Sequence, residues 1–288
     1  MPESLQLLKP NEFPPLLQEI PDRPKQLYLR GTLPSFEHKW LAVVGSRACS
    51  DYGRRALKYL IQGLRGYPVV VVSGLAYGID AEAHLAALEA GLTCVAVPGS
   101  GLDWNALHPR ANVSLAREII EKGGTLLSEE EPDARPRDYM FPKRNRIVAG
   151  LCSATLIVEA QEKSGSLITA KLTTEYNREL LVVPGSIFSN ESKGTHQFLR
   201  LGATAITSPE DILMALGIVK REGAASLSEL RSDLSPEELR VFDIIASPLS
   251  RDQLIESLKL PISEANVLLS LMEIKGLIVE ELGVVRMK

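Results

Sequence analysis

The chain has 288 residues, of which 45% are hydrophobic and 24% charged, and its formal net charge at pH 7 is −4. This length and composition are typical of a globular protein with one large and one smaller domain. A chain that is negative overall is not a general polycation that coats duplex DNA, so any nucleic-acid site has to be local. Because no apolar run reaches the roughly 20 residues of a membrane helix and the start lacks a secretory-signal pattern, we expect a cytoplasmic protein without membrane contact.

Cysteine and histidine spacing argues against a metal site. The three cysteines, Cys49, Cys94 and Cys152, are widely spaced and form no Cys-x-x-Cys pair, which predicts reduced thiols. The four histidines show no ligand spacing either. We therefore predict no bound metal.

The first 39 residues contain several prolines, which disfavour a helical domain. We predict that this segment is extended, packs on the following sheet and includes an added strand over 26–29.

From residue 40 to 217, apolar runs of strand length alternate with segments of helical period. Strands are predicted over 41–44, 69–72, 94–97, 125–127, 155–158 and 180–183, and helices near 52–65, 79–91, 112–122, 165–178 and 192–201. The strand runs are apolar on both faces, which is typical of a parallel sheet covered by helices on each side. The pattern predicts an α/β fold with a doubly wound, mostly parallel sheet.

The character changes after Gly217. The stretch from Lys220 to Ser228 is polar and small, as in a linker, and we place the linker at residues 218–233. Residues 234–288 contain three helical patterns beginning at Ser235, Ser250 and Ile262, the first two with capping-box residues, and then a hairpin pattern around Gly283. Three helices and a hairpin predict a small winged-helix domain. Several glutamates lie on or near the elements that would enter a DNA groove, so a protein-docking or regulatory module remains an alternative.

Small or polar residues follow nearly every strand of the large domain. In an open parallel sheet, ligands bind outside the carboxyl ends of the strands, so these residues should line one crevice where backbone amides face an anion. The alternative is that glycine and serine only make the tight turns of short loops. The strand-end segments are Gly45-Ser46-Arg47, Ser73 to Gly78, Pro98 to Gly101, Ser128-Glu129, Glu159 with Ser164-Gly165-Ser166, and Pro184-Gly185-Ser186.

Among these segments, Gly45-Ser46-Arg47 gives the most specific prediction of an anion site. A tight turn directly after a buried strand would direct the arginine guanidinium toward a phosphate. The chain contains neither the G-x-G-x-x-G fingerprint nor G-x-x-x-x-G-K-[ST]. We therefore predict no nicotinamide or nucleoside triphosphate cofactor.

A basic segment, Phe141-Pro-Lys-Arg-Asn-Arg146, lies between two strand patterns. Cations neutralise phosphates in any sequence context, and an aromatic ring stacks on an unpaired base. This combination suits a nucleic-acid strand. The alternative is a solvated loop whose arginines pair with the three glutamates at 129–131.

The sequence offers little support for catalysis. Asp80 and His84 are four residues apart and share a helix face, which suits an acid–base pair, but the alternative is a helix-start carboxylate and a locally bonded histidine. No G-x-S-x-G motif is present, and no base lies beside Ser73, Ser164 or Ser166 in the sequence. We predict no catalytic residue.

Taken together, these segments resemble the bacterial DNA-processing protein A family, called DprA or Smf. Two positions depart from the pattern, His108 before Pro109 and His196 after Thr195. The matching stretches occur in the family's order and are Val43-Val-Gly-Ser-Arg47, Ser73-Gly-Leu-Ala-Tyr-Gly-Ile-Asp-Ala-Glu-Ala-His84, Phe141-Pro-Lys-Arg-Asn-Arg-Ile147, Val158-Glu-Ala160, Ser164-Gly-Ser166 and Val183-Pro-Gly185.

The resemblance implies an extended Rossmann-like domain that binds single-stranded DNA without base specificity. It also implies a homodimer that hands the strand to the recombinase RecA in natural transformation, and a winged-helix domain at the carboxyl end. The DNA-binding residues expected on this basis are Gly45, Ser46, Arg47, Ser73, Gly74, Phe141, Lys143, Arg144, Asn145, Arg146, Ser164, Gly165, Ser166 and Lys171.

Two other functions remain as alternatives. The first is a nucleotide phosphoribohydrolase similar to the lysine-decarboxylase-like group, whose Pro-Gly-Gly-x-Gly-Thr-x-x-Glu pattern supplies a carboxylate. Here the corresponding segment, which starts at Ser164, ends in the cation Lys171, and this disfavours the enzyme. The second is a transcription factor that acts through the predicted winged-helix domain at residues 234–288.

Overall fold

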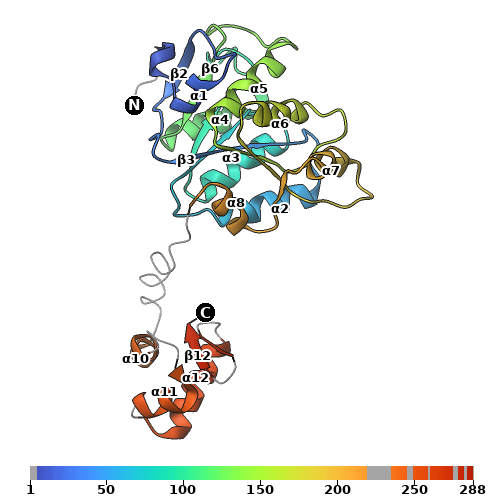
Figure 1. The fold of residues 1–288 in the computed structure, drawn as a ribbon. Helices are drawn as coiled ribbons and strands as arrows, with labels where there is room; N and C mark the ends of the chain where they lie inside the picture. Colours follow the sequence, from blue (N-terminus) through green and yellow to red (C-terminus); the bar gives the residue numbers. More distant parts are fainter. Residues whose placement is uncertain are drawn as a thin grey trace. The chain divides into compact units, whose positions relative to one another are not determined.

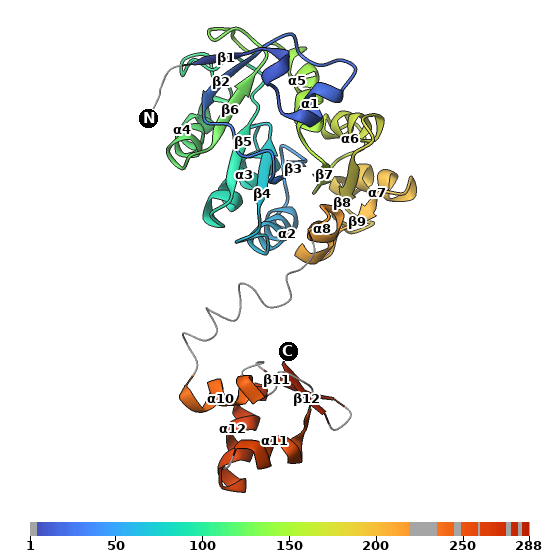
Figure 2. The same ribbon diagram turned by 60° about the vertical axis from the view of Figure 1, so that its left-hand side comes forward.

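The computed structural model describes residues 5–218, 235–244, 249–258, 260–274, 278–281 and 284–287. Its contacts divide the chain into two units, residues 1–220 and 221–288, which are described separately (Figures 1 and 2). Apart from Ile218, the predicted linker lies outside the described residues, as does the turn at Gly283.

A nine-stranded, mostly parallel sheet forms the first unit, in the order β1-β2-β6-β5-β4-β3-β7-β8-β9. Neighbouring strands from β6 to β9 are parallel, whereas β1 and β2 are antiparallel additions beside β6. The six predicted strands and the added strand over 26–29 are confirmed. The strands are β1 (Gln6–Leu8), β2 (Leu27–Gly31), β3 (Lys39–Val44), β4 (Val69–Ser73), β5 (Thr93–Ala96), β6 (Thr125–Ser128), β7 (Ala154–Ile157), β8 (Glu179–Val182) and β9 (Thr204–Ala205).

Helices cover both faces of this sheet, as the two-sided apolar strands predict (Figure 2). Alternate residues of β3 enter different cores: Leu41 and Val43 pack in one, Ala42 and Val44 in the other. The first core includes buried residues of α2 (Asp51–Gln62), α3 (Ile79–Glu89), α4 (Val113–Glu121) and α8 (Pro209–Ala215). The second includes those of α1 (Pro15–Glu19), α5 (Met140–Leu151), α6 (Ser166–Glu175) and α7 (Lys193–Arg200).

Three of these helices, α1, α5 and α8, were not predicted. The most important is α5, because its first two turns hold the basic segment that we interpreted as lying between strands, with a solvated loop as the alternative. Pro142 sits in the first turn, where a backbone N–H has no partner within the helix, so it is tolerated there. Ile147, Val148 and Leu151 then bury one side of the helix.

In the described residues of the second unit, three helices and a small antiparallel sheet enclose a separate core, as predicted for a winged helix. Both predicted capping boxes form: the backbone N–H of Ser235 donates to Glu238 Oε2 over 2.8 Å, and that of Ser250 donates to Gln253 Oε1 over 3.1 Å. The elements are α10 (Pro236–Ile244), β10 (Leu249–Ser250), α11 (Arg251–Leu258), α12 (Ile262–Ile274), β11 (Ile278–Glu281) and β12 (Val284–Met287).

In the described part of the chain, no helix has both the length and the apolar character to cross a membrane. The same residues contain no group of three or more histidine, cysteine or acidic side chains that could hold a metal ion.

Candidate nucleic-acid interface

A pocket of about 580 Å³ lies at the carboxyl ends of β3 and β7. The strand order reverses between these two strands. The strands β4, β5 and β6 lie on one side of β3, whereas β7, β8 and β9 lie on its other side. Such a reversal is where ligands bind in open α/β sheets. Most of the predicted residues line this pocket: Gly45, Ser46, Arg47, Gly74, Phe141, Arg144, Asn145, Ser164, Gly165 and Ser166.

Four predicted residues do not line the pocket. Ser73 is buried within the sheet, where its hydroxyl donates to the Val43 carbonyl over 2.6 Å. Lys171 is exposed on α6, and Lys143 and Arg146 lie on α5 outside the pocket lining. We expected Ser73 to line the crevice because it lies at the end of a strand. Its side chain instead bonds within the sheet.

The turn that carries Arg47 is held rigidly against the start of α3. The Ser46 hydroxyl accepts from the Ala48 backbone N–H over 3.2 Å, and the Ser46 carbonyl accepts from the Ile79 N–H over 3.1 Å. Gly78 permits this approach: its φ is 70°, and a Cβ there would lie 2.3 Å from the Ser46 carbonyl oxygen. The backbone therefore fixes where Arg47 begins.

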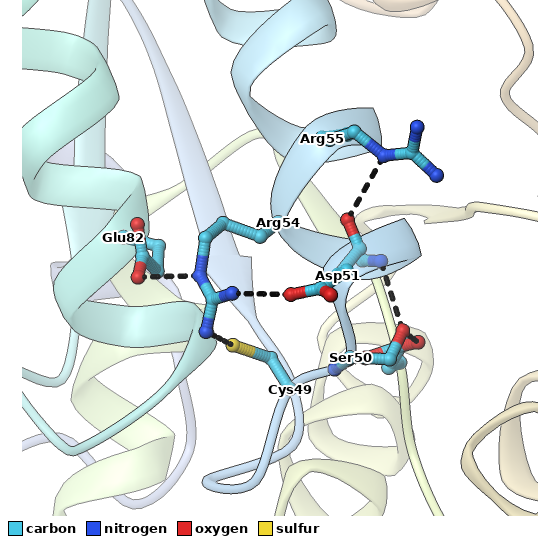
Figure 3. Close-up of polar contacts among 8 residues, drawn as sticks. Cys49, Ser50, Asp51, Arg54, Arg55 and Glu82 are labelled. Atoms are coloured by element: carbon cyan, nitrogen blue, oxygen red, sulfur yellow. Dashed lines mark hydrogen bonds and ion pairs between the residues drawn. The ribbon is translucent and has the colours of Figure 1, made fainter.

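The residues after Arg47 are fixed by the capped start of α2 (Figure 3). The Ser50 hydroxyl accepts from the Gly53 N–H over 3.1 Å, while the Ser50 N–H donates to the buried Glu159 carboxylate over 2.8 Å. Arg54 then joins α2 to α3, since its guanidinium contacts Asp51 at 2.8 Å and Glu82 at 2.9 Å. The ends of β3 and β7 are thus tied to one helix start.

Arg47 and Phe141 form the exposed rim of the pocket. The Arg47 side chain is exposed, its guanidinium carbon lies 5.3 Å from the centroid of the Phe141 ring, and it forms no ion pair within the described residues. Phe141 packs over Gly99, where a Cβ would lie 2.5 Å from the ring. The pair offers an unneutralised cation beside a partly exposed aromatic ring.

Arg144 is not the rim cation that we predicted. It is buried, and its guanidinium donates to the carbonyls of Gly74 and Val97 and lies beside the buried Asp80 carboxylate. Burial lowers the pKa of Arg144 and raises that of Asp80, while the charge of each opposes the shift of the other. A Cβ at Gly74 would lie 2.3 Å from Arg144 Nη1 and 2.4 Å from Asp80 Oδ2. Arg144 therefore builds the pocket wall.

Lys143 and Arg146 are already paired with carboxylates. Lys143 Nζ lies 3.3 Å from Glu129 and 3.0 Å from Glu130, and Arg146 also pairs with Glu129. This corrects our prediction of two free cations and confirms part of the alternative, although the basic residues lie on a helix rather than in a loop. The pairs attach α5 to the segment that follows β6.

Sequence reasoning missed several lining residues, of which Lys163 is the most informative. It is exposed in the loop after β7, directly before Ser164, and it forms no ion pair in the part of the chain that the structure describes. Lys163 could have been predicted from the sequence, because it lies between a strand end and a serine-glycine turn. Gln161, Asp138, Ile168 and Thr169 also line the pocket.

Asp80 and His84 do not form an acid–base pair in the pocket. Asp80 lines it, but the fully buried His84 does not. Burial lowers the pKa of His84 from 6.5 to about 3, so the imidazole is neutral at pH 7.

This histidine makes stability depend on pH. Between pH 6.5 and about 3 the unfolded chain binds a proton at His84 that the folded protein does not, so the free energy of unfolding should fall as the pH falls. The slope reaches about 1.4 kcal/mol per pH unit. In a His84→Leu variant, urea unfolding measured over this range should give a shallower fall; parallel curves for variant and wild type would contradict the assignment.

Family models match both units of the chain. The model described as DNA recombination-mediator protein A covers residues 4–217, and the DprA winged helix domain covers residues 224–283.

Similar curated proteins carry the names Smf and DprA. Protein Smf of Escherichia coli is 44% identical over 201 residues, which are 70% of this chain and 53% of that protein. DNA processing protein DprA of Streptococcus pneumoniae is 43% identical over 201 residues, 70% of each chain. This chain thus spans about half the length of the E. coli relative.

Two solved structures share the fold. The X-ray structure of DprA from S. pneumoniae has a TM-score of 0.69 at 40% identity and covers 74% of both chains. The structure of DNA processing protein A from Helicobacter pylori, described for its single-stranded DNA binding mode, has a TM-score of 0.64 at 29% identity; the match covers 74% of this chain and 95% of the other.

Proposed function

Since this chain belongs to the DNA recombination-mediator protein A family, known as DprA or Smf, we propose that it binds single-stranded DNA without base specificity at the β3–β7 pocket. The observation that carries the proposal is the contact between Arg47 and Phe141 at the pocket rim. A cation beside a ring matches the two features of an unpaired strand, its phosphates and its exposed base faces.

The pocket provides separate positions for these two features. Arg47 and Lys163 supply charges that no carboxylate in the described chain neutralises. The serine-glycine turn before α6 adds the hydroxyls of Ser164 and Ser166 at the start of that helix, and both residues line the pocket. Phe141 offers its partly exposed face to a base, and such stacking tolerates any base. In a duplex the base faces are covered, so this ring favours single strands.

We also propose, on family membership, that the protein acts as a cytoplasmic homodimer which passes the strand to RecA during natural transformation. The second unit is accessory to strand binding in this proposal. Its helix α12 contains no lysine or arginine and carries Glu264 and Glu273, which disfavours a phosphate-facing role.

We propose binding rather than catalysis at the pocket. The Asp80 carboxylate, which lines it, faces the guanidinium of Arg144, and Lys171 stands where the phosphoribohydrolase pattern has a carboxylate. A nucleotide hydrolase would release free base from nucleoside monophosphates. Measuring that release beside strand binding distinguishes the two functions.

Replacing Phe141 with leucine tests the proposal. We expect wild type to bind oligo-dT more tightly than a duplex of the same length, and Phe141→Leu to lose about 1–3 kcal/mol with the single strand because the stacking face is gone. Duplex affinity should not change. Fluorescence anisotropy with both probes measures this; equal losses on the two probes, or none, would contradict a stacking role for Phe141.

A further inference from the structure

A second cluster of cations around an aromatic ring lies next to the pocket, in the loop after β5 and on α4. We call it the Trp104 cluster, and it consists of Trp104, Arg110 and Arg117. The guanidinium carbon of Arg117 lies 4.2 Å from the centroid of the Trp104 ring, and that of the buried Arg30 lies 4.7 Å from it. Two arginines from α4 and β2 thus meet over one ring.

The two outer arginines of the cluster are exposed and fixed in place. Arg110 Nη1 donates to the Trp104 carbonyl over 2.5 Å, and Arg117 stacks on the Trp104 ring. Within the described residues, neither arginine forms an ion pair with a carboxylate. These two charges contrast with Lys143 and Arg146, whose charges are neutralised by neighbouring carboxylates.

The loop after β5 connects this cluster to the pocket. Its Gly99 lies beneath Phe141, and the His108 ring lies 5.8 Å from the Phe141 ring. His108 and Pro109 line a cavity of about 30 Å³ that Arg47 and Phe141 also line, and Arg110 follows directly. Rings and cations therefore form one series: Arg47, Phe141, His108, Arg110, Trp104 and Arg117.

The chemistry of the Trp104 cluster suits phosphates rather than bases. With two guanidinium groups over its ring, Trp104 has little free face for stacking. A guanidinium stacked on a ring keeps its in-plane N–H donors available for a phosphate oxygen. Because the ring already holds the side chain, less rotamer entropy is lost on binding.

We infer that the strand leaves the pocket across His108 and that its backbone phosphates bind Arg110 and Arg117. This inference rests on the proposed function, since it extends the path of the same strand. It predicts that the cluster matters for long strands only, because a strand that fills just the pocket does not reach it.

The test is the variant Arg110→Gln with Arg117→Gln, compared with wild type on two probes: the shortest oligo-dT that wild type binds, and one several times longer. Glutamine keeps the packing of the side-chain stem without the charge. We expect unchanged affinity for the short probe. For the long probe we expect a loss of about 5-fold per arginine at 0.1 M monovalent salt and a salt slope shallower by about 1.4.

Arg65→Gln is the matched control, because Arg65 is an exposed cation in the turn before β4, at the other end of the strands. An equal loss with Arg65→Gln, or no loss on the long probe with the double variant, overturns the inference. Arg110→Gln alone leaves the ring stack intact and should still give about half the change in slope. Arg47→Ala separates the two proposals: if it weakens both probes while the double variant binds like wild type, the pocket stands and the extension falls.

Discussion

An Arg47→Ala variant should bind oligo-dT roughly 10- to 150-fold more weakly than wild type, because a hydrogen bond to a charged group contributes about 1.5–3 kcal/mol. The loss should be the same for oligo-dA and oligo-dC, since phosphates carry no sequence information. The salt slope should become shallower by about 0.7, the value of one single-strand phosphate contact. Anisotropy titrations at several salt concentrations measure all three quantities.

Arg47→Lys provides the matched control for this experiment. Lysine keeps the charge but lacks the planar fork of donors, so its affinity should fall between those of wild type and Arg47→Ala. Because Arg47 is exposed and unpaired in the described chain, neither variant should change the free energy of unfolding by more than about 0.5 kcal/mol. Full affinity in Arg47→Ala would show that the strand binds elsewhere.

An Asp80→Ala variant should lower the free energy of unfolding by about 1–3 kcal/mol, because it removes the buried carboxylate whose charge favours the charged form of the buried Arg144 guanidinium. Asp80 also accepts from the Ala76 N–H over 3.4 Å, a contact that alanine removes. Urea unfolding followed by circular dichroism measures the change in midpoint.

Asp51→Ala is the control, since it removes a carboxylate from an exposed pair with Arg54, which should matter by at most about 1 kcal/mol. Combining Asp80→Ala with Arg144→Leu should recover part of the loss, because no buried charge is then left unpaired. If Asp80→Ala costs no more than Asp51→Ala, the Asp80 carboxylate does not stabilise the buried charge of Arg144.

Much of the fold could be predicted because its strands are buried on both faces. Runs such as 69–72, where every residue is valine, are recognisable without tertiary information, and each predicted strand lies within two residues of an observed one. The pocket followed from the same pattern, since residues just after a parallel strand must lie at one edge of the sheet. Arg47 was found in this way because its turn, Gly45-Ser46-Arg47, follows β3 directly.

The details of α5 could not be predicted, because they depend on partners distant in sequence. Pro142 obscured the helix, although its first-turn position is compatible with one. Arg144 is buried because Gly74 and Val97 bring their carbonyls to it from two other loops. Local sequence shows the charge of Arg144 but not its burial, and the stacking of Arg117 on Trp104, thirteen residues earlier, is equally invisible.

If the proposed strand binding is correct, the pairing of Lys143 and Arg146 with Glu129 and Glu130 affects how long a strand stays bound. Side chains that already pair with carboxylates neutralise no phosphate, so no counterions are released there. The free energy of binding a polyanion is then smaller. A lower affinity means faster dissociation, since affinity differences appear mainly in the dissociation rate. On the proposed function, lasting coverage of a long strand therefore requires several copies of the protein bound along it.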